Sequence, residues 1–406
     1  MSGAGDSSLA TRRGAYVLAL LAFVALGLPD GVLGVAWPSI RVEVDQPVSA
    51  LGILLVAQTG GYLVATAANG ALVGSLGTGR LLAWATGIAT GAFGAFAASG
   101  SWPVMVIASL AVGGAAGMVD AGVNAHVAVH HGRRAMGLLH AAYGVGATAG
   151  PLLVTGLLAA DRTWRGAYGC VASVQAGLLV AFLTTRRRWR WAPAAAGEEP
   201  GPLVGVARPG TTLVLTLSSF FVYTGLEIAT GQWAYSLLTE ERGVAPATAG
   251  LWVAAYWASL TGGRLVMAVA GERGAPATIL GGATAGALLG TVVLWLDPGG
   301  AGAVGLPVIG ASLAPVFPTL VSLTPERLGP RRAAHAIGHQ LSAAGVGAAA
   351  LPSAVAVAVG RRGLGALGPS LLAMATALLA LHLVTQALAR PAELRADRRG
   401  PVGEGR

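Results

Sequence analysis

The 406-residue sequence contains no lysine and a single cysteine, Cys170. Without lysine the chain cannot form the lysine-containing phosphate loop of ATP-hydrolysing proteins. A single cysteine excludes an intrachain disulfide and a metal site built from several cysteines. The H-E-x-x-H and G-x-S-x-G patterns of metalloproteases and serine hydrolases are also missing. We therefore expect a protein that is not an enzyme and that needs neither a cofactor nor a metal ion.

Charged residues are scarce as well. They make up 11% of the chain, whereas hydrophobic residues make up 54%. A soluble domain carries about 25% charged residues, so most of this chain is expected to lie in lipid. The 62 glycines and 21 prolines agree with that expectation, because both residues are more frequent in membrane helices than in soluble ones. We attribute the net charge of +9 to the loops on one side of a membrane and expect no nucleic-acid partner.

Apolar segments of about 20 residues, long enough to cross a bilayer as helices, recur twelve times. They lie near residues 15–40, 49–73, 81–98, 102–128, 135–160, 167–185, 211–237, 246–270, 277–296, 303–323, 333–359 and 368–389. The sequence thus predicts an all-α membrane protein with 12 transmembrane helices. Its expected parts are a six-helix bundle in 1–185, a cytoplasmic linker in 186–210, a second six-helix bundle in 211–390 and a disordered cytoplasmic tail in 391–406.

Arginines are distributed unevenly between the two sides of the predicted membrane. With the N-terminus inside, 19 arginines fall on the inner side and 6 in the outer loops, and Arg264 lies within a span. Because basic residues accumulate on the cytoplasmic side of membranes, both termini are expected in the cytoplasm. The lack of lysine and the excess of alanine and glycine are typical of a GC-rich bacterial genome, so the expected location is the bacterial cytoplasmic (inner) membrane.

The two halves of the chain resemble each other at a spacing of about 200 residues. Asp30 and Trp37 in the first span correspond to Glu227 and Trp233 in the seventh, at offsets of 197 and 196 residues. Parallel six-helix repeats related by an axis along the membrane normal form transporters whose binding site lies at the repeat interface. We therefore expect two pseudo-symmetric bundles with a site between them.

Three acidic residues, Asp30, Asp120 and Glu227, lie inside predicted spans. A carboxylate at the bilayer centre costs about 2.5–3.5 kcal/mol on insertion scales, so it normally faces the bundle interior or water. Asp120 and Asn124 are four residues apart and share one helix face. We assign Asp120 and Asp30 to proton coupling. The alternatives are a structural hydrogen-bonding role for Asp120, and a substrate-ligand or structural role for Asp30.

Other polar residues in the spans are candidates for binding a solute. Glu227, Gln232 and Trp233 together offer acceptors, donors and an apolar surface, which a polyhydroxylated ligand needs. Further candidates for substrate binding are Asn124, His140, Tyr143 and Gln340. Residues expected only to line a cavity are Gln58, Tyr62, Asn69, Tyr256 and Trp257. For each of these residues the alternative is a packing or hydrogen-bonding role between helices. His126 and His339 are proton-relay candidates with the same alternative.

Twelve spans, a basic central loop and duplicated halves resemble the major facilitator superfamily. The segment from Gly70 to Arg80 resembles the cytoplasmic signature Gly-x-Leu-x-Asp-x-x-Gly-x-x-Arg of that family, with Gly70, Leu72, Gly77 and Arg80 matching. Gly74 stands where the family has an acid. The resemblance implies that Arg80 lies at an inner gate. For Arg264, the one arginine within a span, we expect an ion-pairing or gating role, with substrate contact as the alternative.

Within the superfamily the sequence resembles the fucose–proton symporter-like branch. The resemblance rests on Asp30, on the Asp120–Asn124 pair, on the segment from Leu139 to Pro151 and on Gly263-Arg264. In that branch the two acids serve proton coupling and sugar binding. In this chain Asp120 stands where those symporters commonly have glutamate, and Ala125 stands where they commonly have proline.

The expected function is therefore proton symport of a small, sugar-like polar solute by alternating access. The expected partners are this solute, protons and the lipid bilayer, and the chain is expected to be a monomer. The first alternative is a proton-antiport exporter of drugs or secondary metabolites, which a cavity rich in methionine and phenylalanine would favour; the chain has only 6 Met and 7 Phe. The second alternative is a membrane sensor or enzyme that transports nothing.

Overall fold

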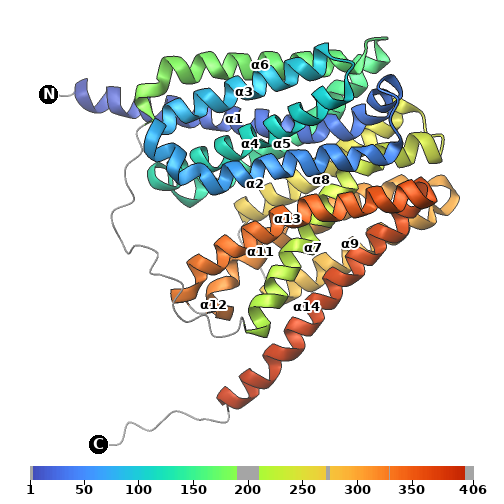
Figure 1. Cartoon of the computed structure of the whole chain (residues 1–406). Coiled ribbons are helices and arrows are strands. Elements are labelled where there is room, and N and C mark those ends of the chain that lie inside the picture. Colours follow the sequence, from blue (N-terminus) through green and yellow to red (C-terminus); the bar gives the residue numbers. More distant parts are fainter. Residues whose placement is uncertain (1–2, 190–209, 271–274, 329, 398–406) are drawn as a thin grey trace, which may run out of the picture.

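The computed structural model describes residues 3–189, 210–270, 275–328 and 330–397, and these residues form helices joined by short loops (Figure 1). The helices of the first half are α1 (Gly3–Glu43), α2 (Leu51–Leu76), α3 (Thr78–Ala98), α4 (Trp102–His130), α5 (Gly132–Ala159) and α6 (Trp164–Thr185). Those of the second half are α7 (Thr211–Ser236), α8 (Pro246–Ala270), α9 (Pro276–Leu296), α10 (Gly305–Leu313), α11 (Val316–Ser322), α12 (Thr324–Leu328), α13 (Pro330–Arg362) and α14 (Leu367–Asp397).

Among the described residues, eleven helical segments are long and apolar enough to cross a membrane. Helix α8, with 25 residues and Arg264 in its interior, lies where the eighth of the predicted spans was expected. The all-α fold with 12 membrane helices is therefore confirmed. The tenth span is divided into α10 and α11 at Pro315, whose ring interrupts helical hydrogen bonding.

One boundary differs from the sequence-based expectation, and another falls largely outside the described residues. Helix α14 continues to Asp397, past residue 390 where the second bundle was expected to end. Most of the predicted linker, residues 190–209, lies outside the described part of the chain, as do residues 398–406 of the predicted tail. The described start of the linker forms one short turn, η2 (Arg186–Arg188).

The twelve spans form two bundles with matching internal contacts, and Figure 1 shows the first bundle (blue to green) beside the second (yellow to red). In the first bundle α1 packs on α5, α2 on α4 and α3 on α6. In the second, α7 packs on α13, α8 on α10 and α9 on α14, which are the corresponding pairs six spans later. The duplication seen in the sequence is thus a duplication of packing.

Glycines bring paired helices of the first bundle into backbone contact. A Cβ on Gly113 of α4 would lie 1.6 Å from the carbonyl oxygen of Gln58 in α2, and one on Gly117 would lie 2.6 Å from that of Tyr62. A Cβ on Gly27 of α1 would lie 2.0 Å from the carbonyl oxygen of Tyr143 in α5. Membrane helices associate through such small residues because lipid supplies no hydrophobic drive between them.

The two bundles contact each other through α1 with α7, α2 with α13, and α5 with α8. Both termini of the described chain lie at the same end of the molecule (Figure 1). Two tight contacts between the bundles, at Gly34 with Gln232 and at Gly52 with Ala356, lie between the middle of the helices and the opposite end, and a third, at Gly144 with Thr261, lies near the middle. We call that opposite end the outer end.

Candidate functional site

Asp120 accepts hydrogen bonds from two neutral side chains. The Tyr62 hydroxyl of α2 donates to its Oδ2 atom at 2.6 Å, and the Asn124 amide donates to its Oδ1 atom at 2.8 Å. Asp120 and Asn124 therefore share one face of α4, as their spacing predicted. The oxygen of the Asn124 amide is buried and has no hydrogen-bond partner among the described residues. One acceptor thus remains free beside the Asp120 carboxyl group.

Asp30 lies on α1 and accepts hydrogen bonds from two other helices. The Tyr143 hydroxyl of α5 donates to Oδ2, and the Gln58 amide of α2 donates to Oδ1 at 3.3 Å. The preceding residue, Pro29, has no N–H, so the carbonyl of Ala25 one turn earlier is free to accept a bond from Gln175 at 3.3 Å. This substitute bond between α1 and α6 keeps the helix satisfied next to the acid.

One face of α2 links the two acids, because Gln58 and Tyr62 are four residues apart and bind Asp30 and Asp120 respectively. The backbone contacts of Gly113 and Gly117 with these same two residues position that face. From the sequence, both side chains were expected only to line a cavity. The signal that could have identified Gln58 and Tyr62 as partners of the acids is an amide and a phenol spaced four residues apart in an otherwise apolar span.

Glu227, in the second bundle, has a charged partner. The Arg264 guanidinium of α8 donates to Glu227 Oε2 at 2.8 Å and to the Tyr223 hydroxyl at 2.8 Å, and the Tyr223 hydroxyl donates to the same carboxylate. The Tyr256 hydroxyl donates to the backbone carbonyl of Glu227 at 2.8 Å. Arg264 thus forms an ion pair with a membrane acid, as was expected of the one arginine within a span.

The three membrane acids therefore have different environments. Glu227 is matched by a guanidinium, whereas no described cation lies within salt-bridge distance of Asp30 or Asp120. Burying an unpaired carboxylate costs several kcal/mol more than burying the neutral acid. A carboxyl group held only by neutral donors can therefore exchange a proton when its access to water changes.

Gln232 connects the two bundles at Asp30. Its amide nitrogen donates to the backbone carbonyl of Asp30 at 2.9 Å, and its own amide oxygen is buried without a described partner. His140, on α5, packs edge-on against Phe23 of α1. Of these two predicted substrate-binding residues, Gln232 thus contacts Asp30, and no described hydrogen bond joins His140 to an acid.

Three other predicted site residues lie apart from the acids. The Trp233 indole is fully buried and donates to the carbonyl of Pro352 at 3.3 Å, so it holds α7 against α13. Gln340 is fully buried and pairs with the Thr324 hydroxyl at 2.9 Å. Arg80 is exposed and forms no ion pair with any described residue. Helix packing already satisfies Trp233 and Gln340, and we leave both out of the proposed site.

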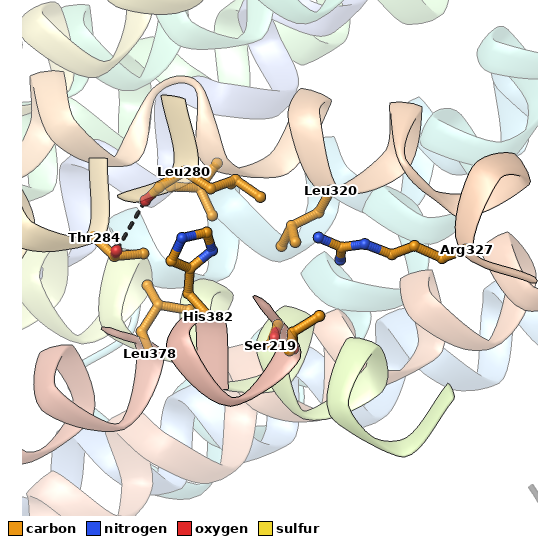
Figure 2. A pocket seen from close by; sticks show the side chains of 9 residues that line it. Ser219, Leu280, Thr284, Leu320, Arg327, Leu378 and His382 are labelled. Carbon is orange, nitrogen blue, oxygen red and sulfur yellow. Dashed lines mark hydrogen bonds between the residues drawn. The ribbon is translucent and has the colours of Figure 1, made fainter. Parts of the chain in front are cut away.

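A small hollow in the second bundle is lined by side chains of α7, α9, α11, α12 and α14. Figure 2 shows Arg327 and His382 reaching toward it from different helices, past Leu280 and Leu320. Its volume is about 10 Å³, which is roughly the space that a single water molecule requires. The hollow is therefore too small for a solute.

The outer end of α1 is joined to η3 (Leu237–Glu241), the turn that follows α7, by an ion pair between Arg41 and Glu240, which bond through two nitrogen–oxygen contacts. Neither residue was identified from the sequence, because the two lie 199 residues apart. Both side chains are about a quarter exposed. The pair bridges the bundles on the side where they are in contact.

We expect Arg41→Gln to loosen the outer end. Exposed ion pairs contribute about 0.2–1 kcal/mol to stability. The fraction of molecules in which the two bundles are separated at the outer end should therefore rise by up to about fivefold. Spin labels on cysteines introduced at Val42 and Glu241, in a Cys170→Ser background, would report the distance distribution. Arg361→Gln, an exposed arginine at the same end, is the matched control. An unchanged distribution in Arg41→Gln would show that the pair does not hold the bundles together.

We also expect the Glu227–Arg264 pair to stabilise the second bundle. Glu227→Gln leaves the guanidinium without its counter-charge, at a cost of about 1–3 kcal/mol. The double variant Glu227→Gln/Arg264→Gln removes both charges and should recover part of the lost melting temperature. Thermal unfolding of the purified variants in detergent measures both effects. Equal melting temperatures for wild type and Glu227→Gln would contradict a stabilising ion pair.

Comparison with known proteins agrees with this architecture. Residues 19–352 match the model of the family described as Major Facilitator Superfamily. An uncharacterized MFS-type transporter of Yersinia pestis is 24% identical over 308 residues, which cover 74% of this chain and 77% of that protein.

Several solved structures share the fold. A nucleoside transporter superposes with a TM-score of 0.73 at 14% identity, covering 93% of this chain and 99% of the other. A peptide transporter gives 0.69 at 15% identity, covering 93% and 94%. A human organic anion transporter gives 0.63 at 17% identity, covering 92% and 98%. At these identities the likeness concerns the fold alone.

Proposed function

Because this chain belongs to the Major Facilitator Superfamily and is a multi-pass membrane transporter of that type, we propose that it imports a small, sugar-like polar solute together with protons. The observation that carries the proposal is the pair of carboxyl groups, Asp30 and Asp120, held only by neutral donors. Intramembrane acids that face a bundle interior are typical of proton pathways. The coupling would use the proton gradient alone, without a further cofactor.

Asp120 is our choice for the residue that carries the proton. Its two partners, Tyr62 and Asn124, are uncharged and belong to the first bundle, so a proton can be gained or lost without breaking an ion pair. Asp30 has a second role in the proposal, because its backbone carbonyl accepts the bond from Gln232 of the other bundle. A change in the protonation or position of Asp30 would therefore alter the contact between the bundles directly.

The choice of a polyhydroxylated solute rests on the hydrogen-bonding groups around the acids. The amide oxygens of Asn124 and Gln232 are buried acceptors without a described donor. Sugar hydroxyls both donate and accept hydrogen bonds, so they can supply the missing donors. The hydroxyls of Tyr62 and Tyr143 stand beside the two carboxyl groups. Glu227 and Arg264 supply an acceptor and a donor from the opposite bundle.

Alternating access would occur by rocking of one bundle against the other around this site. The contacts at the outer end, including the Arg41–Glu240 pair, suit a state that is closed on that side and faces the side of the termini. By the arginine distribution we assign the side of the termini to the cytoplasm and the protein to the bacterial inner membrane. We propose that a single chain is the working unit.

The test is solute uptake by the purified full chain in proteoliposomes, acidic outside and alkaline inside. We expect one or more labelled sugars to accumulate and a protonophore to abolish the accumulation. Protein-free liposomes are the control, and a panel of hydrophobic cations is run in parallel with the gradient reversed. If only hydrophobic cations move against their gradient, the chain is a proton-antiport exporter and the symport proposal fails.

A further inference from the structure

A second hollow, of about 250 Å³, lies at the end of the first bundle that carries the termini, and neither the membrane acids nor their hydrogen-bond partners line it. Its walls are the end of α2, the first turn of α3 and the turn η2. Three arginines, Arg80, Arg186 and Arg187, and the indole of Trp189 line it. The proposed transport mechanism makes no use of this space.

Local backbone geometry gathers these residues in one place. Gly77, with φ of +74°, turns the chain sharply between α2 and α3. A Cβ on Gly79 would lie 2.2 Å from the carbonyl oxygen of Arg186, so η2 rests directly on the first turn of α3. Trp189 is only 3% exposed and packs against Phe182 at 5.2 Å between ring centres, so the hollow has a buried aromatic base.

The hollow has a strong positive charge that no acid among the described residues pairs with. Arg80, Arg186 and Arg187 are exposed, and none of the four ion pairs among the described residues involves them. Guanidinium groups bind phosphate oxygens in a bidentate geometry. The first turn of α3 adds the positive end of a helix dipole. This combination favours a phosphate-bearing ligand.

Two apolar stripes lead from the arginines into the membrane. On α3, Trp84 and Ile88 follow Arg80 by one and two turns and are 64% and 37% exposed. On α6, Leu183 and Val180 precede Arg187 by one and two turns and are 46% and 61% exposed. Helices α3 and α6 pack side by side, so the stripes lie on neighbouring helices. A soluble phosphate would make no contact with these apolar stripes, whereas the acyl chains of a lipid would cover them.

We propose that this hollow binds the headgroup of an anionic phospholipid from the leaflet on the side of the termini. The three arginines hold the phosphate, and the acyl chains lie along the stripes of Trp84 and Leu183. Basic pockets between membrane helices on the cytoplasmic side are suited to such headgroups. The proposal requires only that the chain spans the membrane, and it holds whichever solute is carried.

The test is native mass spectrometry of the full chain in detergent with dioleoyl phosphatidylglycerol or dioleoyl phosphatidylcholine as the probe. We expect the wild type to retain phosphatidylglycerol preferentially. The triple variant Arg80→Gln/Arg186→Gln/Arg187→Gln should bind it at least about tenfold more weakly. The matched control is Arg162→Gln/Arg361→Gln/Arg362→Gln, which removes the same charge from exposed positions at the outer end and should retain the lipid.

Two further measurements keep the test decisive. If the triple variant cannot be purified, the single variants Arg80→Gln and Arg187→Gln should each weaken binding about fivefold. Inorganic phosphate, added as a competitor, should not displace the lipid. Equal retention of phosphatidylglycerol by the wild type and the arginine variants would overturn the proposal. Displacement by inorganic phosphate would overturn the lipid assignment in favour of a soluble anion.

Discussion

Asp120→Asn is expected to abolish proton-driven accumulation of the solute while leaving solute exchange across the membrane intact. Moving one charge through 100 mV supplies about 2.3 kcal/mol, which supports roughly fifty-fold accumulation; the variant should fall to no accumulation. Asparagine has the size of aspartate, and Asn124, whose amide oxygen is free, can turn its amide to accept a bond from the new side chain. The binding geometry is therefore preserved and only the exchangeable proton is lost.

Labelled-solute accumulation and counterflow in the same proteoliposomes measure the two properties separately. The matched control is Asp161→Asn, at an exposed loop residue with φ of +55°, a conformation that asparagine tolerates. It should accumulate solute as the wild type does. Accumulation by Asp120→Asn at the wild-type level would transfer the proton-carrying role to Asp30 or Glu227.

Gly113→Leu is expected to prevent the first bundle from assembling. A Cβ at this position would lie 1.6 Å from the Gln58 carbonyl oxygen, and the obstacle is backbone rather than a movable side chain. Inserting bulk into a packed interior costs about 1–3 kcal/mol even where side chains can adjust. Here α4 would have to move away from α2, which would also separate Tyr62 from Asp120.

The measurement is the yield and melting temperature of the purified variant. Gly91→Leu is the matched control, because nothing lies within 4 Å of a Cβ at Gly91 and the residue is exposed on α3. We expect Gly113→Leu to give little or no monodisperse protein and the control to behave as wild type. Similar yields and melting temperatures for both would mean that the close approach of α2 and α4 is not required.

The fold could be predicted from the sequence because its signals are long and repeated. Apolar runs of membrane length, a single polar linker region and matching acids and tryptophans in the two halves each extend over many residues. The end of α14 could not be placed in the same way. Its last turns, up to Asp397, contain arginine, glutamate and aspartate, and such a segment can be helical outside the membrane as readily as disordered.

The site was predictable only in part. The sequence identified the three membrane acids, since a carboxylate in an apolar helix is costly and conspicuous. Their partners depend on the register between helices, which glycine contacts such as that of Gly113 with Gln58 determine. Trp233 and Gln340 were predicted to bind substrate but are satisfied by neighbouring helices. A polar group in a membrane helix can be satisfied by a ligand or by a neighbouring helix, and spacing within one helix does not distinguish the two.

The central claim, that solute and proton move together through the Asp120 site, is tested most directly by proton movement without an imposed gradient. A pulse of a transported sugar is added outside weakly buffered proteoliposomes, and the external pH is recorded. We predict that wild type alkalinises the medium as protons enter with the sugar and that Asp120→Asn gives no pH change. A sugar that enters without any pH change in the wild type, or with acidification of the medium, would contradict proton symport.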